Sequence, residues 1–257
     1  MDDPEAWFLA FKLLRRLITE GYFSADRMAR DALPALRKNI LGGVAGRLQR
    51  LDKKGYLQNF LVVDQGGQGS SAQPMISAVC KTMKIRKSNV VTVEELPERL
   101  PNTSDPILLV LDDFAGTGSQ LDGRVKELIT SLDKRGSAWR ETTTIIVGAC
   151  LSASEQLVSG LDDGIECSVA IGLPIGSRLM AFSPEAQVFD SEGELEKAKD
   201  VFAAIGRSLV PNAPLGYGDS QLLVVLETNC PNNTIPAFWQ SGSWGGRRWK
   251  ALFERRT

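Results

Sequence analysis

The stretch Ile107-Leu108-Leu109-Val110-Leu111-Asp112-Asp113-Phe114-Ala115-Gly116-Thr117-Gly118-Ser119-Gln120-Leu121 decides how the chain is interpreted. Its first five residues form a continuous apolar run, which is typical of a strand buried on both faces of a parallel sheet. Two adjacent carboxylates follow, and a small loop rich in glycine and hydroxyl groups then opens a helix. The pattern predicts polar groups at the carboxyl end of a strand, where open α/β sheets bind their ligands.

The residue types of this loop suit a sugar phosphate. Asp112 and Asp113 can accept hydrogen bonds from vicinal hydroxyls and can help to retain a hydrated magnesium ion. The loop amides, with the hydroxyls of Thr117 and Ser119, can surround a phosphate at the start of the helix. A plainer interpretation, in which the acids only cap the helix, stays open. A Walker B strand also ends in acids, but the sequence has no Walker A loop to accompany it.

Five more apolar runs accompany this strand, and helical patterns separate most of them. The predicted strands cover residues 60–64, 89–93, 107–111, 143–149, 167–171 and 221–227. The predicted helices between and after them cover residues 74–83, 122–134, 152–159 and 192–207. Strands that alternate with helices predict a doubly wound α/β fold with a mainly parallel sheet.

Residues 6–57 carry helical patterns only, which predicts a helical N-terminal extension (1–57) ahead of the α/β domain (58–257). The first helix is expected to end at Gly21, and the second to run from about residue 24 to 36. A third helix, over about 44–54, has a pattern of basic residues that is typical of a winged-helix recognition element. A basic helix with a solvated face explains it better, because charge runs are usually solvated.

A second glycine-rich turn follows the first predicted strand. It contains Gly66, Gly67, Gln68, Gly69 and Ser70. Such glycines let a backbone approach a ligand closely, and amides at a helix start attract phosphate. Gly67-x-Gly69-x-x-Ala72 also fits a dinucleotide-binding fingerprint, with Glu94 where a ribose-binding acid would lie. A tight turn without a ligand stays open as well.

Composition excludes several kinds of chemistry. The chain has 257 residues, a formal net charge of −1 and no histidine. Catalysis by Ser-His-Asp or Cys-His and histidine-ligated zinc are therefore excluded.

The four cysteines (Cys80, Cys150, Cys167 and Cys230) have neither metal nor redox spacing and are expected to be buried small apolar residues. No apolar run is long enough to span a bilayer, and the acidic N-terminus does not suit a secretion signal, so a cytoplasmic location is expected.

The segment from Asp112 to Leu121 resembles the phosphoribosyl-diphosphate signature of type I phosphoribosyltransferases. The resemblance implies that Asp112 and Asp113 bind the ribose hydroxyls and, indirectly, Mg²⁺. It implies that a loop holds the 5-phosphate, and that the glycine turn at 66–70 corresponds to the family's pyrophosphate loop. The implied phosphate-binding residues are Gly116, Thr117, Gly118, Ser119 and Gln120. Ser119 stands where the family usually has a second glycine, and Gln120 where it usually has threonine.

Two C-terminal segments narrow the resemblance. Residues 214–221 and the stretch Pro231-Asn232-Asn233-Thr234-Ile235-Pro236 with Trp239 are similar to phosphoribosyltransferase-like proteins of bacterial conflict systems, such as anti-phage retrons. The resemblance implies an effector or effector subunit with protein partners in a defence complex. A non-catalytic nucleotide-binding subunit and a Rossmann-like dinucleotide enzyme remain as alternatives. Neither a membrane partner nor direct nucleic-acid binding is favoured.

Three features of the C-terminal half have two interpretations each on sequence alone. Arg178 could clamp a pyrophosphate, although a surface salt bridge explains it better. The Pro231–Pro236 stretch reads as a rigid turn whose Asn232 and Asn233 amides could meet a base, or as a structural corner with Trp239 in the core. The tail at 242–249 could dock on an assembly or fold back on its own core.

Overall fold

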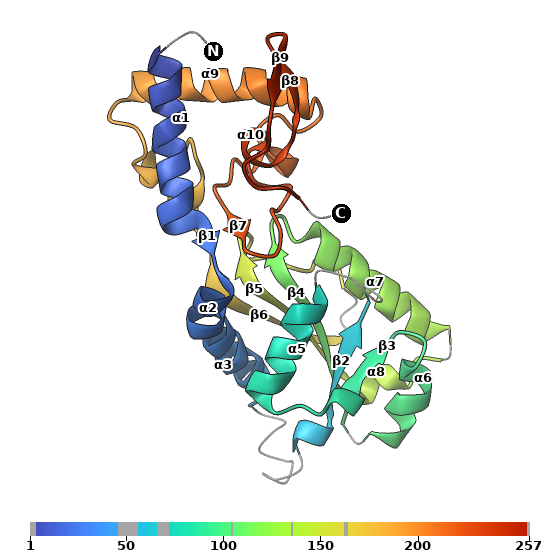
Figure 1. The fold of residues 1–257 in the computed structure, drawn as a ribbon. Helices are drawn as coiled ribbons and strands as arrows, with labels where there is room; N and C mark the ends of the chain where they lie inside the picture. The colour runs from blue at the N-terminus through green and yellow to red at the C-terminus, as the bar shows by residue number, and fades with distance from the viewer. Residues whose placement is uncertain are drawn as a thin grey trace. The chain divides into compact units, whose positions relative to one another are not determined.

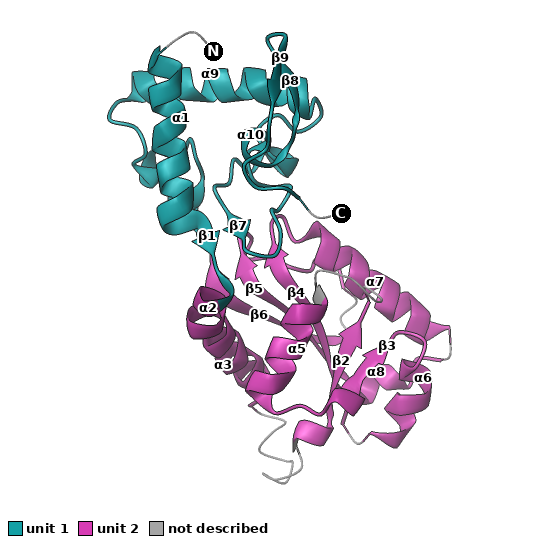
Figure 2. Ribbon diagram, in the orientation of Figure 1, with its two compact units in different colours: residues 1–25, 175–257 teal, residues 26–174 magenta. Residues whose placement is uncertain are grey.

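The computed structural model describes residues 4–45, 56–65, 72–103, 105–134, 136–161 and 164–255. The chain forms two compact units (Figure 2). Unit 1 consists of residues 1–25 and 175–257, and unit 2 of residues 26–174. The chain is thus divided after residues 25 and 174, whereas the sequence pattern placed a boundary after residue 57.

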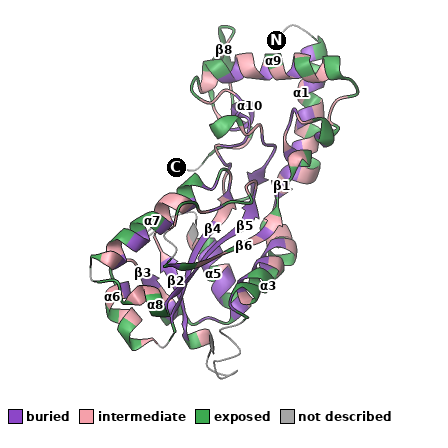
Figure 3. Ribbon diagram, turned by 180° about the vertical axis from the view of Figure 1, so that it is seen from behind, coloured by how far each residue is buried: buried purple, intermediate pink, exposed green. Residues whose placement is uncertain are grey.

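Unit 2 contains a five-stranded parallel sheet with the strand order β3-β2-β4-β5-β6 (Figure 1). The strands are β2 (Phe60–Asp64), β3 (Val90–Thr92), β4 (Ile107–Ala115), β5 (Thr144–Ser152) and β6 (Glu166–Pro174). All nine residues of β5 are buried, as expected for a central strand covered on both faces (Figure 3). The predicted doubly wound, mainly parallel α/β fold is confirmed.

Helices cover both faces of this sheet. They are α2 (Ala25–Arg27), α3 (Leu33–Gly43), α5 (Ala72–Met83), α6 (Leu96–Arg99), α7 (Ser119–Asp133) and α8 (Trp139–Thr142), with a π-helical turn at Met28–Ala32. The apolar face of α7, which includes Val125 and Leu128, packs on Val110 and Val147. On the opposite face, α3 packs on β5 and β6 so closely that a Cβ atom at Gly148 would lie 3.3 Å from the Leu36 side chain.

The strand order creates a topological switch point between β2 and β4. If the five strands are numbered by their position along the chain, their order in the sheet is 2-1-3-4-5. The first strand (β2) and the third (β4) are neighbours, and the connections that follow them leave toward opposite sides of the sheet. Open sheets of this kind generally bind ligands at the carboxyl ends of the strands at the switch point, here β2 and β4. The Thr-Gly loop begins at the carboxyl end of β4, and Gln65, the last described residue before the first glycine-rich turn, directly follows β2.

Most predicted elements of unit 2 are confirmed, and one helix is wrong. The helix expected at 152–159 is absent: β5 continues to Ser152, and the chain then follows an irregular path. Ser154 explains the difference, because its hydroxyl bonds both the N–H (3.1 Å) and the carbonyl (2.9 Å) of Gln156. Such local side-chain bonds compete with helix formation. Residues 46–54 of the third N-terminal helix lie outside the described residues.

Unit 1 combines the first helix of the chain with its C-terminal segments. Its elements are α1 (Pro4–Arg16) with a π-helical turn at Leu17–Gly21, β1 (Tyr22–Phe23), α9 (Glu192–Leu209), β7 (Val225–Leu226), α10 (Pro236–Trp239), β8 (Gly242–Trp244) and β9 (Arg247–Trp249). Leu9 and Leu13 of α1 share one core with Phe202 of α9 and with Phe238. The strand expected at 221–227 is reduced to β7, which pairs with β1. Gln221 has a positive φ of 54°, and Leu222 forms only isolated bridges, to Met180 and Thr234.

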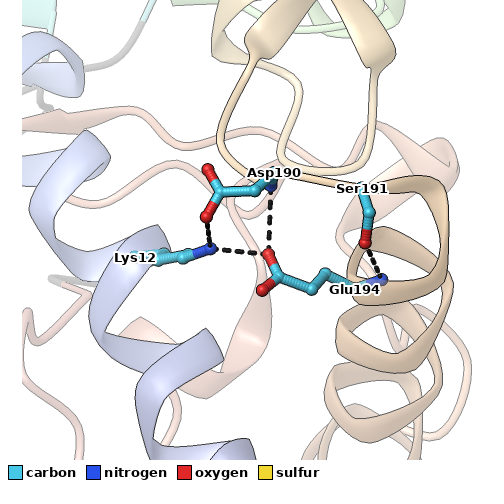
Figure 4. A network of polar contacts seen from close by, with 4 residues as sticks. All are labelled: Lys12, Asp190, Ser191 and Glu194. Atoms are coloured by element: carbon cyan, nitrogen blue, oxygen red, sulfur yellow. Dashed lines mark hydrogen bonds and ion pairs between the residues drawn. The ribbon is translucent and has the colours of Figure 1, made fainter.

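A polar network also joins α1 to the start of α9 (Figure 4). Lys12 Nζ lies 2.8 Å from Asp190 Oδ2 and 2.5 Å from Glu194 Oε2. The Ser191 hydroxyl caps α9 by accepting the Glu194 N–H. Both carboxylates raise the pKa of Lys12, chiefly through their hydrogen bonds, and the Lys12 contact lowers the pKa of Glu194. The network fixes the cationic form of Lys12 between the two helices.

The C-terminal segments serve as structure within unit 1. Trp239 is buried and donates its indole N–H to the Thr234 carbonyl at 2.7 Å, while the Asn233 side chain donates to the Tyr217 carbonyl at 3.1 Å. This supports the structural-corner interpretation of the Pro231–Pro236 stretch. The tail also folds back on its own core, because Trp249 donates to the Ala237 carbonyl at 2.9 Å.

Two further expectations concern cysteines and membranes. Cys80, Cys150 and Cys230 are buried, Cys167 is half-buried, and all four are free thiols. Burial raises the pKa of Cys150 to about 12, helped by the charges of Asp113 and Asp112, which removes this thiol as a nucleophile. Among the helices of the described residues, none is long and apolar enough to cross a bilayer.

Candidate functional site

The two acids lie inside β4 and not in the loop after it. The sequence placed the end of the strand at Leu111, but β4 continues to Ala115, and Asp112 and Phe114 pair with Ala149 and Leu151 of β5. The reason is the partner strand, since β5 runs on to Ser152 and offers ladder hydrogen bonds as far as Ala115. The acid pair therefore stands on a hydrogen-bonded backbone at the switch point.

Asp112 is a buried carboxylate with a cationic partner. The residue is 4% exposed, and its Oδ2 lies 3.1 Å from Nη1 of Arg124, on the second turn of α7. Its Oδ1 accepts the N–H of Asp113 at 3.0 Å. Burial raises the pKa of Asp112, while the charge of Arg124 and the hydrogen bonds from Asp113 act in the opposite direction. Arg124 thus stabilises the anionic form of Asp112.

Asp113 is the more easily protonated of the two acids. Burial and the negative charge of Asp112 together raise the pKa of Asp113 to about 7. Because Arg124 pairs with Asp112 and the pKa of Asp113 is raised to about 7, the two carboxyl groups hold fewer than two negative charges at neutral pH. The pair can therefore take up or release a proton near neutral pH, a property that general acid–base groups need.

Gly118 fixes the loop between β4 and α7. Its φ is +82°, the left-handed region that glycine tolerates best, and a Cβ atom there would lie 2.6 Å from the carbonyl oxygen of Gln156. The 15-residue helix α7 then begins at Ser119. Its N-cap residue is Gly118, which has no side chain to cap the helix. The Ser119 N–H contacts the Thr117 hydroxyl at 3.4 Å, so an anion at this helix start would replace that contact or bind the amides that follow.

Three of the five predicted phosphate-binding residues line a small pocket at this helix start. The Thr117 and Ser119 hydroxyls lie 2.9 Å apart, and both residues line a pocket of about 160 Å³ together with Gly118. Asp122 also lines it, but its charge is paired with Lys126 at 2.7 Å. Gly116 lies in the bend before this loop, and Gln120 is exposed in the first turn of α7. The loop thus offers hydroxyls and amides to an anion.

Two residues that the sequence analysis missed connect the parts of the site. Arg124 is one of them, and Gln65, directly after β2, is the other. The Gln65 side-chain amide donates to the Arg124 carbonyl at 2.8 Å, and its buried Oε1 has no hydrogen-bond partner among the described residues. Neither was recognisable without the structure, because twelve residues separate Asp112 from Arg124 and fifty-nine separate Gln65 from Arg124. The turn at Gly66, Gly67, Gln68, Gly69 and Ser70 lies outside the described residues.

The acid pair can contribute to a magnesium site but does not form one by itself. In the part of the chain that the structure describes, no cluster of three or more acidic or cysteine side chains could enclose a metal ion. Mg²⁺ commonly keeps several waters and binds through one or two carboxylates together with phosphate oxygens of a substrate. Asp112 and Asp113 fit this second mode, in which the metal arrives with its ligand.

Arg178, considered above as a clamp, is a surface residue of unit 1. Its side chain is 75% exposed, and its Nη2 lies 3.9 Å from Glu20 Oε2. This is the surface salt bridge that the sequence analysis preferred.

Comparison with protein-family models identifies the family of the chain. The model of a protein family described as PRTase-CE matches residues 2–255, which is nearly the whole chain. No curated protein and no solved structure shows significant similarity to the chain. A match of this extent, to a chain whose doubly wound sheet carries an acid pair and a Thr-Gly loop, shows that the protein belongs to the PRTase-CE family of phosphoribosyltransferase-like proteins.

Proposed function

We propose that the protein binds phosphoribosyl diphosphate, or a nucleoside 5-monophosphate, at the carboxyl ends of β2 and β4. The observation that carries the proposal is the juxtaposition of the Asp112–Asp113 pair with the loop fixed by Gly118. Both lie on one strand–loop–helix unit at the switch point of the sheet. The acids would receive the ribose hydroxyls, and the residues from Gly116 to Gln120 would hold the 5-phosphate.

The proposed reaction is transfer of the ribose phosphate to or from a nucleobase-like group. Such a transfer depends on positioning and on stabilising positive charge at the sugar ring, which a fixed carboxylate pair can supply. The pKa of about 7 at Asp113 favours this enzymatic role over binding alone, because a group that titrates near neutral pH can exchange a proton during the reaction. Mg²⁺ would supply charge neutralisation at the diphosphate.

The glycine turn supports a further part of the proposal. If Gly66 to Ser70 hold the pyrophosphate, Gln65 at the start of that turn would position them against α7 through its bond to the Arg124 carbonyl. A Rossmann-like dinucleotide enzyme would use the same turn. The two alternatives differ in their need for Asp113. The phosphoribosyl site requires this acid, whereas a dinucleotide site does not.

Calorimetry tests the binding site directly. Phosphoribosyl diphosphate with Mg²⁺ is titrated into the wild type, D113N, D113A and, as matched control, D31N, which changes an exposed aspartate of the same unit that pairs locally with Arg30. We expect D113N and D113A to weaken binding at least tenfold, about the loss of one charge-assisted hydrogen bond, and D31N to bind like wild type. Equal affinity for all four proteins would refute the site.

Pyrophosphate release separates transfer from binding alone. Incubation of the wild type with phosphoribosyl diphosphate, Mg²⁺ and a set of free nucleobases should release pyrophosphate and form a nucleotide. Tight binding without any product would favour the alternative, a non-catalytic nucleotide-binding subunit.

We further propose that the protein acts in bacterial anti-phage defence, such as a retron, as an effector or effector subunit with protein partners in the cytoplasm. The support is the resemblance of the segments at 112–118 and 231–236 to phosphoribosyltransferase-like proteins of conflict systems. Phage plating on cells that carry the intact operon, compared with D112N/D113N and D31N versions, tests it. Loss of protection in the double variant alone would support an effector whose pocket is needed. Equal protection by all versions would leave a purely structural role.

A further inference from the structure

Helix α1 of unit 1 carries apolar side chains on two sides. One side packs into the core of the unit through Leu9, Leu13 and Leu17, which are all buried. At 3.6 residues per turn, a second group of apolar residues lies on the other side of the helix. Its four members are between 54% and 60% exposed, and we call them the α1 stripe: Trp7, Phe8, Phe11 and Ile18.

The α1 stripe concentrates most of the exposed apolar surface in the described part of the chain. Seven large apolar side chains are exposed there, and four of them belong to α1 and the π-helical turn that continues it. Aromatic side chains of this size, a little over half exposed, present roughly 400 Å² together with Ile18. Apolar patches of about 300–600 Å² on a monomer are often functional. A helix that is apolar on both sides is expected to be covered on both.

One cation lies within the α1 stripe. Arg15 follows Phe11 by four residues and Phe8 by seven, so it lies on the same side of the helix, and it is exposed. Its guanidinium forms no ion pair with any described residue, whereas the neighbouring Arg16 is paired with Glu20. The two ends of α1 are also oppositely charged, since the first turn carries an acid and the last turn two arginines.

These charges fit an antiparallel pair of α1 helices from two copies of the chain. If the two helices cross at Phe11, Arg15 of each copy lies opposite Trp7 of the other, because both are four residues from the crossing. A guanidinium over an indole is a favourable cation–π contact. The basic end of each helix then lies beside the acidic first turn of the other. A parallel pair would place the two Arg15 side chains next to each other.

The charge of the segment argues against a lipid surface as the occupant. Helices that lie in a membrane interface are typically rich in lysine and arginine. Residues 1–20 contain only three basic residues, Lys12, Arg15 and Arg16, against four acidic ones, Asp2, Asp3, Glu5 and Glu20. Lys12 is moreover bound to two carboxylates of its own unit. Anionic headgroups would therefore attract this segment only weakly.

We propose that the α1 stripe binds the same stripe of a second copy of the chain, in a two-fold symmetric antiparallel pair centred on Phe11. Two stripes bury roughly 800 Å² of apolar surface before the polar rim is added, which is at the low end for specific interfaces. The dimer is therefore reversible, with a dissociation constant on the order of micromolar. The contact involves unit 1 only and does not depend on the proposed phosphoribosyl site.

Sedimentation velocity of the full chain, from about 1 to 200 µM, tests the dimer. We expect the wild type to shift from monomer to dimer over this range, and F11E, which places a charge at the crossing, to stay monomeric. L252E is the matched control, because Leu252 is 59% exposed in the same unit but lies outside α1. F11E should keep the melting temperature of the dilute wild type, since Phe11 is exposed in the single chain.

The sign of the effect of R15A tests the antiparallel arrangement. In the antiparallel pair, R15A removes the contact with Trp7 of the second copy and should weaken the dimer about three- to tenfold. In a parallel pair, R15A would remove a repulsion between two arginines and would tighten the dimer. R207A, which removes an exposed arginine of α9 in the same unit, controls for net charge and should dimerise like wild type.

Several outcomes would overturn the proposal. A wild type that stays monomeric over the whole range would show that the α1 stripe does not bind a second copy. A dimer that persists in F11E would place the contact elsewhere, and an R15A dimer as tight as wild type or tighter would reject the antiparallel pair. Vesicles of phosphatidylcholine and phosphatidylglycerol test the lipid alternative. Co-sedimentation of a monomeric wild type, but not of F11E, with these vesicles would assign the stripe to a membrane surface instead.

Discussion

Arg124 Nη1 lies 3.1 Å from Asp112 Oδ2, and the Asp112 side chain is only 6% exposed. The pair joins β4 to α7 across the candidate site. A buried carboxylate of this kind depends on its cation, because removing one member leaves the other charged and uncompensated.

R124A should therefore destabilise unit 2 by about 3 kcal/mol near neutral pH, the usual cost of breaking a buried ion pair. Burial already raises the pKa of Asp112, and loss of Arg124 raises it further, so the variant's deficit should grow as pH rises above about 4. Thermal melts between pH 4.5 and 8 measure this. The double variant R124A/D112N, which removes the buried charge, should be more stable than R124A at pH 8. A deficit independent of pH would contradict the ion pair.

The second prediction concerns the raised pKa of Asp113. Its folded-state pKa of about 7 lies above the unfolded value near 4, so its stabilising contribution is present below pH ~4 and is lost as pH rises toward 7. D113N cannot ionise and should keep its stability over this range. The melting temperature of the wild type should thus fall relative to that of D113N between pH 5 and 8, while D31N should follow the wild type. Parallel curves for wild type and D113N would show that the pKa is not raised.

A third prediction tests why glycine occupies position 118. G118A places a Cβ atom 2.6 Å from the Gln156 carbonyl oxygen in a residue with φ of +82°, so the loop must shift. We expect loss of phosphoribosyl diphosphate binding and a stability cost above the ~1–2 kcal/mol of the left-handed conformation alone. G160A is the control, because Gly160 also has a positive φ of 64° but no atom within 4 Å of a Cβ. Equal costs for both variants would mean that the contact with Gln156 is unimportant.

The fourth prediction concerns the core of unit 1. Leu13 is fully buried among Phe202 and Phe238, whereas Leu252 is 59% exposed. L13A should cost about 2–5 kcal/mol, and L252A less than ~0.5 kcal/mol. Urea unfolding followed by tryptophan fluorescence reports mainly on unit 1, since four of the five tryptophans lie there. Similar midpoints for the two variants would show that α1 is not part of the core.

The sequence predicted the sheet well because its strands are buried on both faces. Continuous apolar runs such as Phe60–Asp64 need no alternation to be recognised, and β2 has the bounds that the sequence predicted. Prediction failed where local contacts decide the conformation, as at Ser154, whose hydroxyl bonds Gln156 and replaces a helix. It also failed at the end of β4, since the length of that strand depends on β5 and not on the acids themselves.

The candidate site was predictable only in its local part. Asp112, Asp113 and Gly118 belong to one contiguous motif, so residue types and spacing were sufficient to select them. Arg124 was not, because its role depends on how α7 is rotated against β4.

The composition of unit 1 from both ends of the chain has a consequence for synthesis. On the ribosome, α1 is made first, but the residues that cover Leu9 and Leu13 belong to 175–257 and are made last. At ~5–20 residues per second, completing that last segment alone takes on the order of ten seconds after residue 174 has been added. Residues 26–174 can fold during translation, whereas the apolar side of α1 stays uncovered until residues 175–257 have been added.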